Sequence, residues 1–116
     1  EGLLAWDVRR LVRLSRELPV QAVPLSQIAE LDSVHWYGHG SVKPTVRSII
    51  EHCQLMLAAD LAYPIILDSA GRVMDGMHRV SKALMQGATQ ITAVQFERDP
   101  APDYVDCDPD LLPYDD

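Results

Sequence analysis

The segment 64–87, PIILDSAGRVMDGMHRVSKALMQG, constrains the fold of this chain more than any other part of the sequence. Two short apolar runs, PIILD and RVMD, flank the turn sequence SAG, and this pattern predicts a hairpin of two strands. The second run ends in Asp75-Gly76 and passes at once into a helical pattern over about 77–86, with Gly87 as its left-handed cap. We therefore expect a strand, a tight turn and a helix in direct succession.

The rest of the chain predicts shorter elements around this unit. Pro44 fits the first position of a helix, because the amide proton that proline lacks has no partner there. Apolar residues then recur with helical spacing at positions 46, 49, 50, 53, 56 and 57. The other expected elements are an amphipathic helix over 5–18 ended by Pro19, a strand over 20–23, one or two helical turns in LSQIAEL after Pro24, a loop over 32–43, and a strand over 91–96 that closes the sheet.

Length and composition limit the classes of protein to which the chain can belong. A chain of 116 residues that is 47% hydrophobic and 23% charged has room for one ordinary hydrophobic core. The longest apolar runs are far shorter than the roughly 18 residues that a membrane span requires. Its two cysteines are too few for a disulfide scaffold and suit a reducing compartment, so we expect a cytoplasmic protein.

The negative charge is concentrated at the C-terminal end. Residues 97–116 contain eight acidic residues and one arginine, and this tail accounts for the whole net charge of −7. The neutral body disfavours DNA binding, which depends on many contacts between cationic side chains and phosphates. One basic cluster lies on the first predicted helix. It is either a solvated face or a docking surface for the acidic tail, and its members are Arg9, Arg10, Arg13 and Arg16.

The turn after the second strand of the hairpin carries the candidate chemistry. The amide protons of residues 76–79 open a helix and have no partners within it, which favours a phosphate at this position. Gly76 permits close approach of a ligand oxygen to the backbone, and Arg79 can donate two parallel hydrogen bonds to it. His78 can donate or transfer a proton, and Lys82 can add positive charge. Asp75 can bind Mg²⁺ or accept a proton from a hydroxyl nucleophile.

The same residues also have purely structural interpretations. Asp75 is a favoured helix cap, Gly76 an ordinary turn residue, and Asp75 with Arg79 a common exposed pair on a helix. Spacing alone does not decide between a phosphate site and a stable turn.

Three segments of the chain resemble the ParB/sulfiredoxin superfamily over most of residues 20–96. VQAVPLSQIAEL is similar to the first strand and helix of that family, YPIILDSAGRVMDGMHR to its central strands and signature turn, and GATQITAVQF to its closing strand. DGMHR in particular resembles the DG-x-HR sequence of ParB-like proteins and of the related free-serine kinases. The resemblance implies an α+β domain with a small mixed sheet flanked by helices. It also implies a nucleotide-phosphate site, with Gly76, His78 and Arg79 at the matching positions and Asp75 as the matching acid. Met77 joins the candidate binding residues through its backbone amide, which lies within the turn 76–79.

Departures from the family pattern narrow the function that the resemblance implies. Sulfiredoxins carry a reactive cysteine between the glycine and the histidine, whereas this chain has Met77, a thioether that cannot serve as a thiolate. Chromosome-partitioning members continue into a helix-turn-helix, whereas this sequence continues into an acidic tail. The free-serine kinases use a further carboxylate near the first strand, for which Glu30 and Asp32 are the candidates here. The family pattern tends to place an alanine six residues after the glycine, whereas this chain has Lys82 there and Ala83 one position later. The role of Lys82 is therefore left open.

The loop DSVHWYGHGSVK allows several interpretations. Its histidines, together with His52 and His78, suggest a metal site, but Gly38 and Gly40 disfavour the helix that would align them. Stacking of Trp36 or Tyr37 on a nucleobase, closure of the loop over the site, and simple packing of the rings are the alternatives.

These observations lead to one expected architecture and two expected functions. We divide the chain into an N-terminal helix (1–19), a ParB-like domain (20–96) and an acidic tail (97–116). The leading hypothesis is a domain that binds ATP, ADP or CTP, with Mg²⁺ at Asp75. If it is an enzyme, Asp75 and His78 serve in phosphoryl transfer or nucleotide hydrolysis. The alternative is a non-catalytic interaction or sensing module whose acidic tail binds a protein partner.

Overall fold

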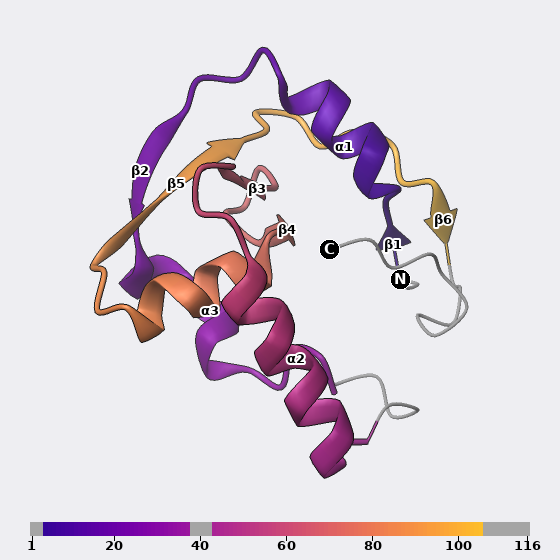
Figure 1. The fold of residues 1–116 in the computed structure, drawn as a ribbon. Coiled ribbons are helices and arrows are strands. Elements are labelled where there is room, and N and C mark those ends of the chain that lie inside the picture. Colours follow the sequence, from indigo (N-terminus) through magenta and orange to yellow (C-terminus); the bar gives the residue numbers. More distant parts are fainter. Residues whose placement is uncertain (1–3, 38–42, 106–116) are drawn as a thin grey trace.

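A four-stranded mixed sheet forms the centre of the molecule. The computed structural model describes residues 4–37 and 43–105 (Figure 1). The strand order is β2 (Gln21–Pro24), β5 (Gln90–Gln95), β3 (Ile65–Leu67) and β4 (Val73–Asp75). β5 is antiparallel to β2 and parallel to β3, and β4 is antiparallel to β3. The strand that we expected to close the sheet therefore lies inside it, because the helix after β4 returns the chain to the far side of β3.

Within residues 4–37 and 43–105, three α-helices, two 3₁₀ turns and a two-stranded pair accompany the sheet, and the α+β class is confirmed. The helices are α1 (Val8–Ser15), α2 (Val46–Ala58) and α3 (Met77–Met85). The 3₁₀ turns are η1 (Leu25–Gln27) and η2 (Ala29–Asp32), and the small antiparallel pair joins β1 (Leu4–Ala5) to β6 (Tyr104–Val105). Within the described residues, no helix is both long and apolar enough to cross a membrane.

Side-chain caps set the helix ends and correct two expectations. Asp7 accepts a hydrogen bond from the Arg9 amide at 2.9 Å, so α1 begins after Asp7, and it ends at Ser15, well before Pro19. The Thr45 hydroxyl accepts the Ser48 amide at 3.1 Å, so α2 begins one residue after Thr45 rather than at Pro44. The N-caps set the first residues of both helices, so α1 starts three residues and α2 two residues later than expected, whereas α2 contains all the apolar positions from 46 to 57 that predicted it.

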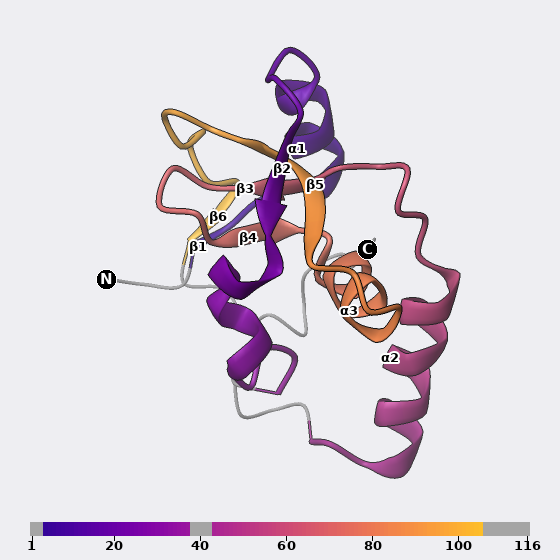
Figure 2. The same cartoon turned by 90° about the vertical axis from the view of Figure 1, so that its left-hand side faces the viewer.

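The sheet buries a different cluster of side chains on each face. Alternation along the central strands directs Ile65 and Leu67 of β3 and Ala93 of β5 toward α3, where Val80 is fully buried. Ile66 and Val94 point to the opposite face, where they pack with Leu11 of α1 and with Phe96. Figure 2 shows α1 and α3 on either side of the sheet. This arrangement packs α1 against one face of the sheet that residues 21–95 form.

The hairpin turn is held by a buried aspartate. Asp68 is 6% exposed, and its Oδ1 accepts the amides of Ala70 and Arg72 at 3.0 and 2.8 Å. Gly71 adopts φ +85°, a conformation that favours glycine. The expected hairpin around residues 69–71 is confirmed, and Gly87 likewise has φ +80° at the C-terminal end of α3.

Helix α2 differs from the expected pattern in its burial. None of its 13 residues, all of which the structure describes, is buried, although α2 packs beside α3. Val46, Ile49, Ile50 and Leu57 are each about half exposed or more. The helical spacing of these residues predicted the helix correctly, but it did not predict that so much apolar surface would stay accessible.

The described part of the acidic tail docks on α1. The Arg10 guanidinium donates to the Asp103 carboxylate at 3.2 Å and to the Ala101 carbonyl at 2.6 Å, and the Trp6 indole donates to the Pro100 carbonyl at 2.9 Å. The hydrogen bond from the Asp7 amide, followed by Arg10 and Arg13, holds the pKa of Asp103 below its ordinary value of 3.8. Docking of the tail on the basic helix is therefore confirmed at Asp103, and residues 106–116 lie outside the described part.

Candidate functional site

The corner between β4 and α3 can accommodate glycine but not a larger residue. Gly76 has φ +108°, and a Cβ added there would lie 2.7 Å from Cγ2 of Ile65. The first helical hydrogen bond of α3 runs from the Val80 amide to the Gly76 carbonyl at 3.0 Å. Among the described residues, no acceptor bonds the amides of Met77 and Arg79. The turn thus leaves backbone donors at the positive end of α3.

Asp75 and Arg79 form an ion pair one helical turn apart. Their side chains are 7% and 14% exposed, and Nη2 of Arg79 lies 2.7 Å from Oδ2 of Asp75. Nη1 of Arg79 donates to the carbonyls of Tyr63 and Pro64 at 2.9 and 2.8 Å. The structural interpretation of this pair as exposed is wrong, since both groups are largely covered. Of the five N–H donors of the guanidinium, these contacts with described residues use three.

His78 is held in a small aromatic cluster. Its Nε2 lies 2.9 Å from Nδ1 of His52 on α2, and its side chain is almost fully buried. The Trp36 ring stacks on both imidazoles, with ring-centre distances of 4.4 Å to His52 and 4.6 Å to His78. Within the described residues, the buried indole N–H of Trp36 has no hydrogen-bond partner. Of the interpretations for Trp36, the structure shows ring packing, and the stacked partners are two histidines.

The sequence indicated the ring residues of this cluster but not their pairing. His52 and His78 are 26 positions apart on different helices, and no periodic pattern relates them. Their contact depends on how α2 packs against α3 and on how the loop before α2 folds back. The sequence had suggested a metal site formed by the loop histidines together with His52 and His78. Among the described residues, no three His, Cys, Asp or Glu side chains are placed to hold a metal, and His39 lies outside them.

Two of the predicted site residues have side chains directed away from the turn. Met77 is 5% exposed and packs in the core beneath α3, and it does not line the pocket described below. The Lys82 ammonium donates to the carbonyls of Leu57 and Ala59 at 3.0 and 2.7 Å, at the C-terminal end of α2. This contact stabilises the end of that helix, because its last carbonyls have no partners within it. The structure brings Asp75, Gly76, His78 and Arg79 together and places Lys82 elsewhere.

The carboxylates considered from the first-strand region also lie apart from the turn. Oε2 of Glu30 accepts the Val73 amide at 2.7 Å and so ties η2 to the edge strand β4. Neither Glu30 nor Asp32 lines the pocket described next.

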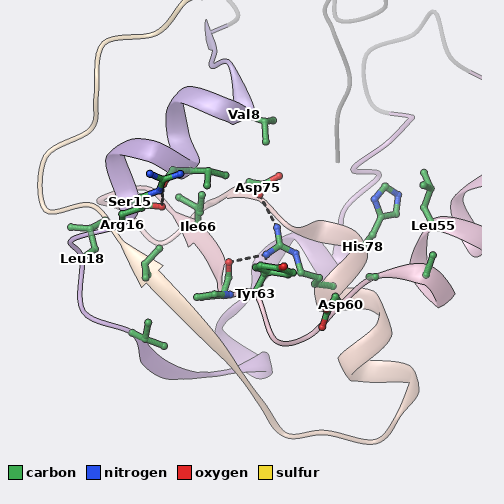
Figure 3. A pocket seen from close by; sticks show the side chains of 17 residues that line it. Val8, Ser15, Arg16, Leu18, Leu55, Asp60, Tyr63, Ile66, Asp75 and His78 are labelled. Carbon is green, nitrogen blue, oxygen red and sulfur yellow. Dashed lines mark hydrogen bonds and ion pairs between the residues drawn. The ribbon is translucent and has the colours of Figure 1, made fainter.

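A pocket of about 610 Å³ opens beside the turn. Asp75, His78 and Arg79 line one part of it, and most of its other walls are apolar side chains from α1, α2 and the sheet. Figure 3 shows Arg16 and Leu18 on one side, His78 and Leu55 on the other, and Asp75 between them. The pocket therefore combines a compact polar region with apolar walls, as sites for small organic ligands commonly do.

Comparisons with protein-family models, with curated proteins and with solved structures found no match to this chain. The resemblance of the DGMHR segment to ParB-like proteins therefore rests on the sequence motif and its strand–turn–helix setting.

Proposed function

We propose that this protein binds a nucleoside di- or triphosphate in the pocket beside the β4–α3 turn. The observation that carries the proposal is that Asp75, His78 and Arg79, three of the five residues of the DGMHR segment, line this pocket, whereas Gly76 and Met77 do not. The phosphates lie against the amides of α3 and the remaining donors of Arg79. The base lies against apolar walls such as Leu18, Leu55 and Val94.

Size and polarity support this assignment. Pockets for small molecules commonly enclose about 300–1000 Å³, and about 610 Å³ falls within that range. An anion gains from the helix dipole and from charge-assisted hydrogen bonds, whereas a flat heterocycle gains from apolar contact. A nucleotide has both parts in one molecule. ATP, ADP and CTP differ in their base or in their number of phosphates, but all three contain a diphosphate. This shared diphosphate is the group that the site recognises.

The ion pair between Asp75 and Arg79 favours nucleotide binding over catalysis. Oδ2 of Asp75 is bonded to Arg79 at 2.7 Å, so this oxygen is not available as a base in the conformation described. Phosphoryl transfer or hydrolysis would require a ligand phosphate to draw Arg79 away from it. His78 would then donate a proton to a phosphate oxygen, and Asp75 would accept one from the attacking hydroxyl. If the ligand phosphate does not release Asp75 from Arg79, the protein binds the nucleotide without catalysis and acts as a sensing module.

We expect Mg²⁺ to bind at the turn together with the nucleotide and not in its absence. Magnesium is usually held by one or two carboxylates together with substrate phosphates, and Asp75 is the carboxylate at the turn. In that role the ion would neutralise phosphate charge. The paired state of Asp75 means that its release from Arg79 must accompany metal binding.

Titration calorimetry with ATP, ADP and CTP, with and without Mg²⁺, tests the proposal. We expect heat of binding for at least one nucleotide and a loss of about 10- to 100-fold in affinity in Arg79→Lys, which keeps the charge but lacks the forked donors. The matched control is Arg72→Lys, because Arg72 is paired with Asp68 at 2.9 Å, is 74% exposed and lies outside the pocket.

Equal affinity in the two lysine variants, or no heat with any of the three nucleotides, would refute the proposal. Turnover by the unmodified protein that is lost in Asp75→Asn would identify an enzyme, and binding without turnover would identify a sensing module.

A further inference from the structure

Among the described residues that line the pocket, Tyr63 is the only aromatic residue besides His78. It is 66% exposed. The two rings that the loop sequence suggested for stacking on a nucleobase, Trp36 and Tyr37, do not line the pocket. The Trp36 ring stacks on histidines instead, and the Tyr37 hydroxyl lies 3.1 Å from the hydroxyl of Ser48. Tyr63 is therefore the phenol ring that a ligand in this pocket can contact.

A short turn fixes the backbone that carries Tyr63. Oδ1 of Asp60 accepts the Ala62 amide at 2.9 Å, and the Asp60 carbonyl accepts the Tyr63 amide at 3.3 Å. Pro64 follows directly, and the residue before a proline is restricted to extended conformations. A tyrosine side chain is oriented by only two torsion angles, so ordering it against a ligand costs little conformational entropy. The ring is thus presented to the pocket from a constrained backbone.

Arg79 connects Tyr63 to the phosphate end of the pocket. Its Nη1 donates to the Tyr63 carbonyl at 2.9 Å, and its Nη2 lies 2.7 Å from Oδ2 of Asp75 (Figure 3). The residue that carries the ring is therefore bonded directly to the cation that we propose to bind the phosphates. Because a single ribose joins the base of a nucleotide to its phosphates, the base must lie close to the group that holds them.

The Tyr63 side chain has surface available for a ligand. Within residues 4–37 and 43–105, no other ring stacks on it and no group is hydrogen-bonded to its hydroxyl. An aromatic face can stack on any nucleobase, and a phenol hydroxyl can stay in water at the opening of a pocket. A flat base has two faces, so contact of one face with the aliphatic walls leaves the other face for a ring.

We propose that Tyr63 stacks on the base of the bound nucleotide. This inference rests on the proposed function, because it assigns a residue to the base end of the same pocket. Stacking of this kind tolerates every base, so Tyr63 contributes affinity for the nucleoside part of the ligand and little selectivity between ATP and CTP. Tyr63 lies outside both the DGMHR segment and the loop 32–43, so neither sequence feature indicated this role.

Calorimetry on the full chain with ADP and with pyrophosphate separates the base contact from the phosphate contact. Tyr63→Leu removes the ring, and Tyr63→Phe keeps it. We expect the affinity for ADP to fall about tenfold in Tyr63→Leu and to stay within about twofold in Tyr63→Phe. Pyrophosphate has no base, so its affinity should be the same in all three proteins. In the unmodified protein, nuclear Overhauser effects should connect the Tyr63 ring protons with H2 or H8 of bound ADP.

Tyr37→Leu is the matched control, because it makes the same replacement at a tyrosine that does not line the pocket. It should leave the affinities for ADP and pyrophosphate unchanged. The inference would be overturned by ADP binding that Tyr63→Leu does not weaken, or by an equal loss for pyrophosphate, since Tyr63 would then act through Arg79. ADP binding without a contact between the base and Tyr63 would refute the inference alone. Absence of ADP binding in the unmodified protein would refute the proposed function as well.

Discussion

Replacement of Gly76 by alanine should destabilise the fold through two separate costs. The first is conformational, because φ +108° is unfavourable for an L-residue by about 1–2 kcal/mol. The second is steric, because the new Cβ would lie 2.7 and 3.0 Å from Cγ2 and Cβ of Ile65, and 3.0 Å from Nη2 of Arg79. Overpacking of a core typically costs about 1–3 kcal/mol. The free energy of unfolding should therefore fall by about 3 kcal/mol.

Gly87→Ala provides a control that carries the first cost without the second. Gly87 has φ +80°, and a Cβ added there would have no atom within 4 Å. We expect a loss of about 1 kcal/mol in this variant. The difference of about 2 kcal/mol between the two variants then measures the contact of the β4–α3 corner with Ile65.

Thermal and urea unfolding followed by circular dichroism measure both variants. For a chain of this size, 1 kcal/mol corresponds to a shift in Tm of about 4 °C, so Gly76→Ala should melt about 12 °C below the unmodified protein. Equal destabilisation by the two substitutions would show that the corner does not press against β3. The description of the turn as a glycine-specific corner would then be wrong.

Two further predictions concern contacts at a distance from the turn. Lys82→Met should lower the free energy of unfolding by about 1–2 kcal/mol in urea titrations, because the C-terminal carbonyls of α2 lose their ammonium donor. The affinity for ADP should stay unchanged. Unchanged stability together with weakened ADP binding would contradict this role of Lys82. The docked carboxylate of Asp103 has a lowered pKa, so its contribution is fully present above pH 3.8 and is lost as the pH falls through that lowered value. Carbon-13 titration of Asp103 should give a midpoint below 3.8 that rises in Arg10→Gln, and a midpoint unaffected by this substitution would refute the contact.

The local elements of this fold were predictable because their determinants are close together in the sequence. The hairpin follows from two short apolar runs around residues 69–71, and the corner follows from a glycine between a strand and a helix. Gly87 was recognisable as a cap for the same reason. Helix starts were less well predicted, since the N-caps Asp7 and Thr45 place the first residues of α1 and α2 later than expected, and α1 also ends at Ser15, before the expected residue 18.

The tertiary contacts of the site were not predictable in the same way. Spacing placed Lys82 one helical turn after Arg79, but its long side chain reaches the end of α2 instead. The pairing of His52 with His78 depends on the relative rotation of two helices, which the periodicity of either helix leaves open. The apolar spacing of α2 predicted the helix but not its burial, and the structure leaves much of its apolar surface accessible.

The most direct test of a phosphate site at the start of α3 is the response of individual backbone amides to a ligand. In ¹H–¹⁵N spectra of the full chain titrated with ADP, the largest shifts should fall on the amides of residues 76–79, with smaller shifts along the apolar walls of the pocket. Pyrophosphate should shift the same four amides without affecting the walls. Saturating ADP that leaves residues 76–79 unshifted, or that shifts a different surface, would contradict the proposed site.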